Sequence, residues 1–304
     1  MMRRQALIGA AAWLAGAPCG ATAAPSERTS RPGRIERLEL PPGPALDPRP
    51  VDVWLPPGYR ADRPHAVLYM HDGQMLFDPR GTWNQQAWQV DAVAAPLIAS
   101  GALRDFIVVG TWNAGAARHA EYFPQGFLPH LPAPLREQLV AERLQGRPRS
   151  DAYLRFLVET LKPAVDARYA TDPGRHASFL MGSSMGGLIS CYALCEYPEV
   201  FGGAACLSTH WIGHFERNPE VPAAALAYLD QKLPAPARVK LWMDRGDQEL
   251  DAKYDDAQAR VDALMAAKGF RAPGFVSRVY PGTGHNETAW SARLAEPLRF
   301  LLGA

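Results

Sequence analysis

FLMGSSMGGLISCYALC, residues 179–195, is the stretch that decides how this chain folds. It contains the pattern G-x-S-x-G centred on Ser184, with an apolar run at 177–181 before it and a helical pattern at 187–195 after it. A strand, a sharp turn and a helix in this order are typical of a nucleophile elbow, which exposes a serine hydroxyl at the top of a sheet. The pentapeptide alone also fits a glycine-rich turn in any α/β protein, so the residues that would act with Ser184 have to distinguish the two interpretations.

Strand and helix patterns alternate along the rest of the chain. Strand-like segments occur at 34–40, 51–55, 66–70, 106–112, 203–208, 239–243 and 275–280. Helical patterns occur at 89–98, 151–169, 252–268 and 288–302. Residues 113–146 show no strand pattern and are expected to cross over the top of the sheet. The alternation predicts an α/β protein with a mostly parallel sheet that is covered by helices on both faces.

The amino terminus has the composition of an export signal. Residues 1–23 contain two arginines, a short apolar run and a small-residue cleavage site. We therefore expect an exported protein, periplasmic or secreted, with a signal peptide at 1–23, a linker at 24–34 and a single catalytic domain at 35–304. Both the general secretory route and the twin-arginine route fit the leader.

Charge and cysteine content exclude several classes of partner. Without its leader the chain has 30 basic and 31 acidic side chains, which gives no reason to expect nucleic acid or an anionic membrane as a partner. The apolar part of the leader is too short to remain as a membrane-spanning helix. Cys191, Cys195 and Cys206 lack metal-ligand spacing and are expected to be buried small hydrophobic residues, although a bridge to Cys206 remains open. No cofactor is expected, and the oligomeric state is left open.

A serine hydroxyl needs a neighbouring base to take its proton and a carboxylate to orient that base. His285 is the only one of the eight histidines that lies in a loop after the last predicted strand, and this loop is rich in glycine. Three carboxylates, Asp247, Glu249 and Asp251, follow the predicted strand at 239–243. The order serine, acid, histidine is that of the α/β-hydrolases, but spacing alone leaves all three acids open.

Acyl transfer also requires two donors for the oxyanion of the tetrahedral intermediate. The backbone amide of Met185, directly after the candidate nucleophile, is the first donor expected. The second is expected from the loop after the third strand, where a glycine allows the amide of Gln74 or Met75 to turn toward the serine. His71 and Asp72 in the same loop have no further ligand at metal-binding spacing, so no metal site is expected.

Taken together and in this order, these segments resemble the putative esterase family of α/β-hydrolases. The matching segments are residues 53–78, 113–124, 182–187, 245–254 and 284–290. The similarity is greatest to enterochelin-esterase-like members and extends to S-formylglutathione hydrolase-like serine esterases. The resemblance implies the α/β-hydrolase fold and a serine esterase without a cofactor. An aspartate just before a helix is the usual acid of that family, which favours Asp251 as the triad acid with Glu249 as second choice.

Loops around Ser184 are expected to supply the substrate-binding residues Arg118, Tyr122, His210 and Trp211. Tyr122 and Trp211 would form an apolar wall. Arg118 would meet an anionic group of the substrate or, in the alternative that we favour slightly, pair with Glu121 and brace its loop. Three tryptophans, at 83, 88 and 290, are expected to pack in the core.

The sequence therefore predicts a serine carboxylic-ester hydrolase that acts on a small-molecule ester through an acyl-enzyme on Ser184. An acyltransferase of the same fold, which passes the acyl group to a sugar or lipid hydroxyl, is the alternative. A binding protein that reuses the fold is a third hypothesis, which a broken triad would favour. The identity of the ester is not encoded in any feature discussed above.

Overall fold

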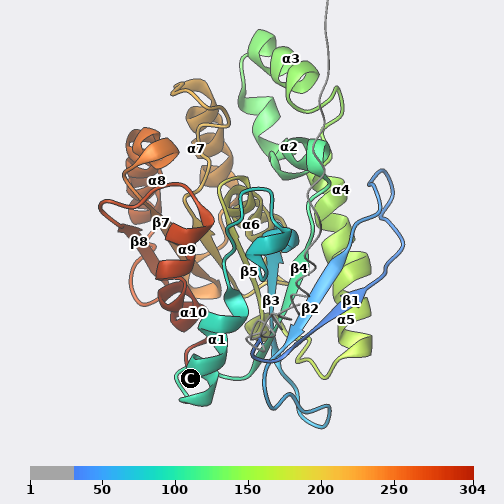
Figure 1. The fold of residues 1–304 in the computed structure, drawn as a ribbon. Helices are drawn as coiled ribbons and strands as arrows, with labels where there is room; N and C mark the ends of the chain where they lie inside the picture. The colour runs from blue at the N-terminus through green and yellow to red at the C-terminus, as the bar shows by residue number, and fades with distance from the viewer. Residues whose placement is uncertain (1–30) are drawn as a thin grey trace, which may run out of the picture. The chain divides into compact units, whose positions relative to one another are not determined.

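Eight strands form one sheet in the order β1-β2-β4-β3-β5-β6-β7-β8 in the computed structural model of the chain, which describes residues 31–304 (Figure 1). The strands are β1 Arg34–Leu38, β2 Val51–Leu55, β3 Ala66–His71, β4 Phe106–Thr111, β5 Ser178–Ser183, β6 Gly203–Leu207, β7 Lys240–Arg245 and β8 Phe275–Val279. β2 pairs antiparallel with β1 and β4, and every other pairing is parallel. The predicted signal peptide at 1–23, and most of the predicted linker, lie outside the described residues.

Helices cover both faces of this sheet. They are α1 Val90–Ala99, α2 Arg118–Tyr122, α3 Ala133–Glu142, α4 Ser150–Arg155, α5 Lys162–Arg168, α6 Met185–Glu196, α7 Glu220–Lys232, α8 Asp255–Ala267, α9 Glu287–Arg293 and α10 Ala295–Leu302. Successive side chains of a strand point to opposite faces, so each parallel strand contributes to two apolar clusters. In β3, Val67 and Tyr69 join the cluster under α4 to α8, whereas Leu68 and Met70 join the cluster under α1, α9 and α10. The predicted α/β architecture is confirmed.

Two predicted helices are interrupted, and a proline accounts for each interruption. The predicted helix at 288–302 is divided into α9 and α10, because Pro297 in the first turn of α10 has no N–H to continue the hydrogen-bond ladder. The predicted helix at 151–169 contains a π-helical turn at Phe156–Leu161 just before Pro163.

The three cysteines expected in the core are buried and free. Within residues 31–304, no helix has the length and apolar character needed to cross a bilayer.

The segment at 113–146 is attached to the sheet by a buried ion pair. Arg49, just before β2, donates two hydrogen bonds to Glu121 of α2, at 2.6 and 2.7 Å. Both side chains are almost completely buried. The slightly favoured expectation that Arg118 pairs with Glu121 is therefore wrong, because Glu121 points toward Arg49 and Arg118 has a different partner.

Truncation of Glu121 tests this attachment. Glu121→Ala leaves the Arg49 guanidinium buried without a counter-charge, so we expect the free energy of unfolding to fall by about 3–5 kcal/mol in urea denaturation. The additional change Arg49→Met should recover part of the loss. Arg60→Ala, which breaks an exposed ion pair with Asp62, should have little effect. Equal stability of Glu121→Ala and Arg60→Ala would contradict this account.

Candidate active site

Ser184 occupies a strained turn between β5 and α6. Its φ of 57° and ψ of −123° lie in a region that residues with a side chain rarely adopt. A Cβ at Gly182 would lie 2.6 Å from the backbone of Gly186, so the turn closes only with glycine at that position. The Ser184 amide donates to the carbonyl of Leu207 in β6, which holds the turn against the sheet. The predicted nucleophile elbow is present.

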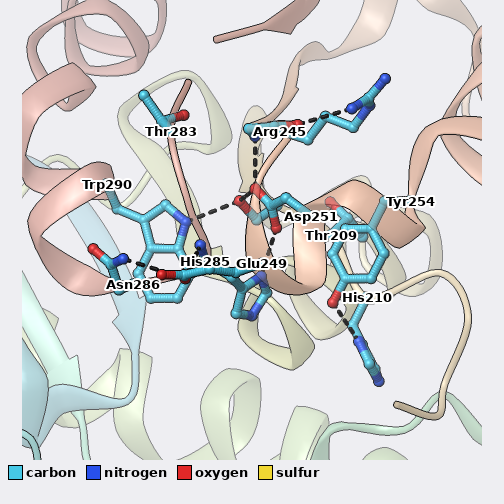
Figure 2. A network of polar contacts seen from close by, with 12 residues as sticks. Thr209, His210, Arg245, Glu249, Asp251, Tyr254, Thr283, His285, Asn286 and Trp290 are labelled. Atoms are coloured by element: carbon cyan, nitrogen blue, oxygen red, sulfur yellow. Dashed lines mark hydrogen bonds and ion pairs between the residues drawn. The ribbon is translucent and has the colours of Figure 1, made fainter. Parts of the chain in front are cut away.

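His285 and Asp251 form a hydrogen-bonded pair beside this turn (Figure 2). The Nδ1 atom of His285 lies 2.6 Å from a carboxylate oxygen of Asp251, which is fully buried. The other oxygen accepts from the Ser208 hydroxyl and the Gly246 amide, each at 2.6 Å. Burial alone would raise the pKa of Asp251, but the hydrogen bond and charge of His285, with these two donors, lower it below its ordinary value. Asp251 is therefore a buried carboxylate aimed at one ring nitrogen.

The other two candidate acids contact backbone rather than the imidazole ring. Glu249 is exposed and accepts from the backbone amide of His285 at 2.8 Å. Asp247 accepts from the backbone amide of Gly282 at 2.7 Å. Both therefore hold the loop that carries His285 without touching its ring. Of the three carboxylates that the sequence leaves open, Asp251 is the one that contacts the imidazole.

A buried network below Asp251 holds its carboxylate in place. The hydroxyl of Ser208 accepts hydrogen bonds from Trp290 Nε1 and from Arg293, each at 2.9 Å. Arg293 also pairs with the buried carboxylate of Asp244, at 2.9 Å. Since Trp290 and Arg293 both donate to the Ser208 oxygen, the Ser208 hydroxyl directs its own proton to Asp251. The sequence offered no motif for Ser208, and its only signal is its position directly after β6.

Tyr254 lies close to both Ser184 and His285. Within residues 31–304 the Ser184 hydroxyl makes no hydrogen bond to the His285 ring. Burial raises the pKa of Tyr254 well above its ordinary value, and the nearby Ser184 side chain opposes this rise. The Tyr254 ring also packs edge-on against His285, with 5.7 Å between ring centroids. Ser184 and His285 therefore share Tyr254 as a neighbour.

His210 holds the other side of Tyr254. Its Nδ1 atom lies 2.6 Å from the Tyr254 hydroxyl, and Figure 2 shows the two side chains meeting. Burial lowers the pKa of His210 well below its ordinary value, so the ring is neutral at pH 7. A neutral Nδ1 can accept a hydrogen bond from the Tyr254 hydroxyl, which fixes the direction of the phenol O–H.

Two backbone amides near Ser184 have no hydrogen-bond partner in the described part of the chain. They are the amide of Met185 at the start of α6 and the amide of Gln74 in the turn Gly73–Met75. The amide of Met75 donates to the carbonyl of Asp72 at 2.8 Å and is occupied. Of the two amides that the sequence leaves open in this loop, that of Gln74 is the one without a hydrogen-bond partner among residues 31–304.

Arg118 braces the turn that carries Gln74. It donates two hydrogen bonds to Asp72, at 2.7 and 2.8 Å, and the Asn113 side chain adds a third at 2.6 Å. Burial would raise the pKa of Asp72, but Arg118 and Asn113 lower it below its ordinary value. The charge of Arg118 is thus largely neutralised by Asp72, although its side chain still lines the cavity.

A cavity of about 830 Å³ contains Ser184, His285, Arg118 and His210 in its lining. Tyr122 and Trp211 are absent from the lining because they are fully buried, and each makes a core hydrogen bond, with the Asp72 amide and with Gln258 respectively. The predicted apolar wall is therefore wrong.

The rim of the cavity carries exposed aromatic rings instead. Trp83 is 86 % exposed and lines the cavity, so its predicted place in the core is wrong. Phe215, which the sequence did not single out, also lines the cavity and is 63 % exposed. Trp88 and Trp290 are buried as predicted, and they reach the cavity wall. Residues 31–304 contain no cluster of three or more side chains able to hold a metal ion.

The family described as Putative esterase matches residues 46–301. The chain belongs to this family. Among curated relatives it is 25% identical over 253 residues to an endo-1,4-beta-xylanase/feruloyl esterase of Xylanibacter ruminicola, a match that covers 79% of this chain and 27% of that protein. It is 21% identical over 263 residues to YbbA of Bacillus subtilis, covering 84% and 93% of the two chains. The chain thus spans about a quarter of the first relative's length.

Solved structures of two esterases and a serine hydrolase show the same fold. A ferulic acid esterase superposes with a TM-score of 0.62 at 17% identity, covering 89% of this chain and 98% of the other. An IroE-like serine hydrolase of Shewanella oneidensis gives 0.63 at 19% identity, with 89% and 80% covered. The enterobactin esterase FES of Shigella flexneri gives 0.62 at 17% identity, with 89% and 59% covered. These likenesses identify the sheet and its helices as an α/β-hydrolase fold.

Two single glycine-to-alanine variants test how the loop after β7, which carries Asp251, packs against the loop after β8, which carries His285. A Cβ at Gly246 would lie 2.0 Å from the carbonyl oxygen of Thr283, in the loop that leads to His285. Gly246→Ala should therefore force the loops apart and lower the free energy of unfolding by about 1–3 kcal/mol. At Gly274 the nearest atom would be 3.7 Å away, so Gly274→Ala is the matched control and should be tolerated. Equal urea midpoints for the two variants would contradict the packing described.

Proposed function

We propose that this chain is a secreted or periplasmic serine esterase that hydrolyses a carboxylic ester through an acyl-enzyme on Ser184. The observation that carries the proposal is the hydrogen bond between Asp251 and His285 beside the strained Ser184 turn, in a cavity with two free backbone amides. Export is supported by the composition of residues 1–23.

The chemistry follows from the positions of these groups. The Ser184 hydroxyl turns toward the free ring nitrogen of His285, gives up its proton to that nitrogen and attacks the ester carbonyl carbon. The amides of Met185 and Gln74 stabilise the resulting oxyanion. His285 then passes the proton to the leaving alcohol as the carbon–oxygen bond breaks. Asp251 stabilises the imidazolium that forms in between.

Water completes the cycle by the same route. It takes the place of the alcohol, and His285 removes a proton from it as it attacks the acyl carbon. The second tetrahedral intermediate collapses, the acid leaves, and the proton returns to Ser184. Each oxyanion donor is expected to supply about 3 kcal/mol of barrier reduction.

The rim of the cavity fits an ester with a ring in it. Trp83 and Phe215 expose large aromatic surfaces on which a planar ring can stack. Two named relatives are feruloyl esterases or contain that activity, and the feruloyl group is aromatic. We propose an aromatic ester as the substrate class, with its ring held at this rim.

Replacement of the nucleophile tests the mechanism. Ser184→Ala should lower kcat for p-nitrophenyl acetate by about 10⁶-fold, because serine and histidine act as one unit. Ser183→Ala, which removes the neighbouring hydroxyl in the same cavity, is the matched control and should keep most of the activity. Equal turnover by wild type and Ser184→Ala would refute the serine mechanism.

A second pair of variants tests which acid orients the base. Asp251→Asn should lower kcat by about 10⁴-fold at pH 7, because the amide cannot hold His285 in the required tautomer. Glu249→Gln keeps a carbonyl oxygen for the His285 amide and should cost less than about tenfold. The assignment is wrong if Glu249→Gln is the more damaging change and Asp251→Asn remains active.

A further inference from the structure

A second cavity, of about 740 Å³, lies at the amino ends of the parallel strands, whereas Ser184 lies at their carboxyl ends. It is lined by residues at or near the amino ends of parallel strands, among them Phe179 of β5, Gly202 before β6, and Lys240 of β7. Ser184 follows the carboxyl end of β5, so the six residues of that strand separate the two cavities by roughly 20 Å. We call this second cavity the basic hollow.

The basic hollow contains five formal positive charges. They belong to Arg104, Arg175, Arg238, Lys240 and Arg271. His176 also lines it, and none of the residues that form its walls is an aspartate or glutamate. The chain as a whole is nearly neutral, so this concentration of one sign is a local feature that net charge does not reveal.

Neutral groups rather than carboxylates orient three of these cations. Arg104 donates to a backbone carbonyl at 2.9 Å and lies over the ring of Phe179, 5.1 Å from its centroid. Its Nε atom is buried and has no hydrogen-bond partner among the described residues. Arg175 and Lys240 also donate to backbone carbonyls. Carbonyl groups satisfy N–H donors but leave the positive charges uncompensated.

One carboxylate, that of Asp172, acts on Arg104 in the hollow and does not neutralise it. Asp172 pairs with His176 at 2.9 Å. Burial lowers the pKa of Arg104, and the negative charge of Asp172 opposes this change only in part. Burial also lowers the pKa of Lys240, and the positive charge of Arg104 lowers it further. Arg104 and Lys240 therefore repel one another, and a bound anion would relieve this repulsion.

We propose that the basic hollow binds a phosphate group, carried either by a soluble phosphorylated molecule or by a phospholipid headgroup. Guanidinium groups present planar pairs of donors that match phosphate oxygens, and an ammonium adds a point charge. A phosphate dianion has more acceptor oxygens and more negative charge than a single carboxylate, so it can form more charge-assisted hydrogen bonds with several cations at once. The site is independent of Ser184, and binding there leaves the catalytic cavity open at the other edge.

Binding of two phosphate probes tests the proposal. Inorganic pyrophosphate is titrated calorimetrically, and sedimentation is measured with vesicles of phosphatidylglycerol and, as a neutral reference, phosphatidylcholine. The double variant Arg238→Gln/Lys240→Gln removes two exposed cations of the hollow. The control Arg136→Gln/Arg155→Gln removes the same charge from α3 and α4, away from it.

Wild type and control should bind at least one probe in a saturable, salt-sensitive manner, and the hollow variant should bind it at least tenfold more weakly. Binding of pyrophosphate identifies a soluble phosphate as sufficient, whereas binding only to phosphatidylglycerol vesicles identifies the headgroup as the source. The proposal is overturned if wild type binds neither probe, or if the hollow variant binds as tightly as the control. Hydrolysis of p-nitrophenyl acetate should be the same in all three proteins, which separates this test from that of the esterase mechanism.

Discussion

The hydrogen bond between Asp251 and His285 is the contact on which the rest of the site depends. It joins the loop after β7 to the loop after β8, and Ser208 brings the end of β6 to the same point. Parallel strands place all their carboxyl ends at one edge of a sheet, so the groups meet although about a hundred residues separate Ser184 from His285. The buried Arg293 and Asp244 beneath them keep this junction rigid.

The sequence predicted the sheet, the elbow and the order of the site loops because each depends on a periodic or positional signal. Apolar runs specify buried strands, and strand order then specifies which loops converge. Side-chain directions inside the loops have no such signal. Proximity in sequence suggests Glu121 as the partner of Arg118, whereas its partner in the structure, Asp72, lies in a different loop. For the same reason the sequence predicts Trp211 in the cavity and Trp83 in the core, whereas Trp211 is buried and Trp83 is exposed.

Ser208 shows a further limit of sequence patterns. It has a φ of 44° in a turn after β6, and its hydroxyl links Asp251 to two donors from α9. Nothing in the local sequence distinguishes such a serine from an ordinary turn residue. The basic hollow is also hidden from the sequence, because its five cations come from four separated segments and the total charge of the chain is close to zero. Both features arise from tertiary structure alone.

The central claim is that Ser184 is made nucleophilic by His285, and covalent labelling tests it most directly. A fluorophosphonate probe is reacted with the folded protein, and the modified peptide is identified by mass spectrometry. The account predicts one adduct, on Ser184, and its loss in a folded His285→Ala variant. An adduct on another residue, or equal labelling of Ser184 in the absence of the imidazole, would contradict it.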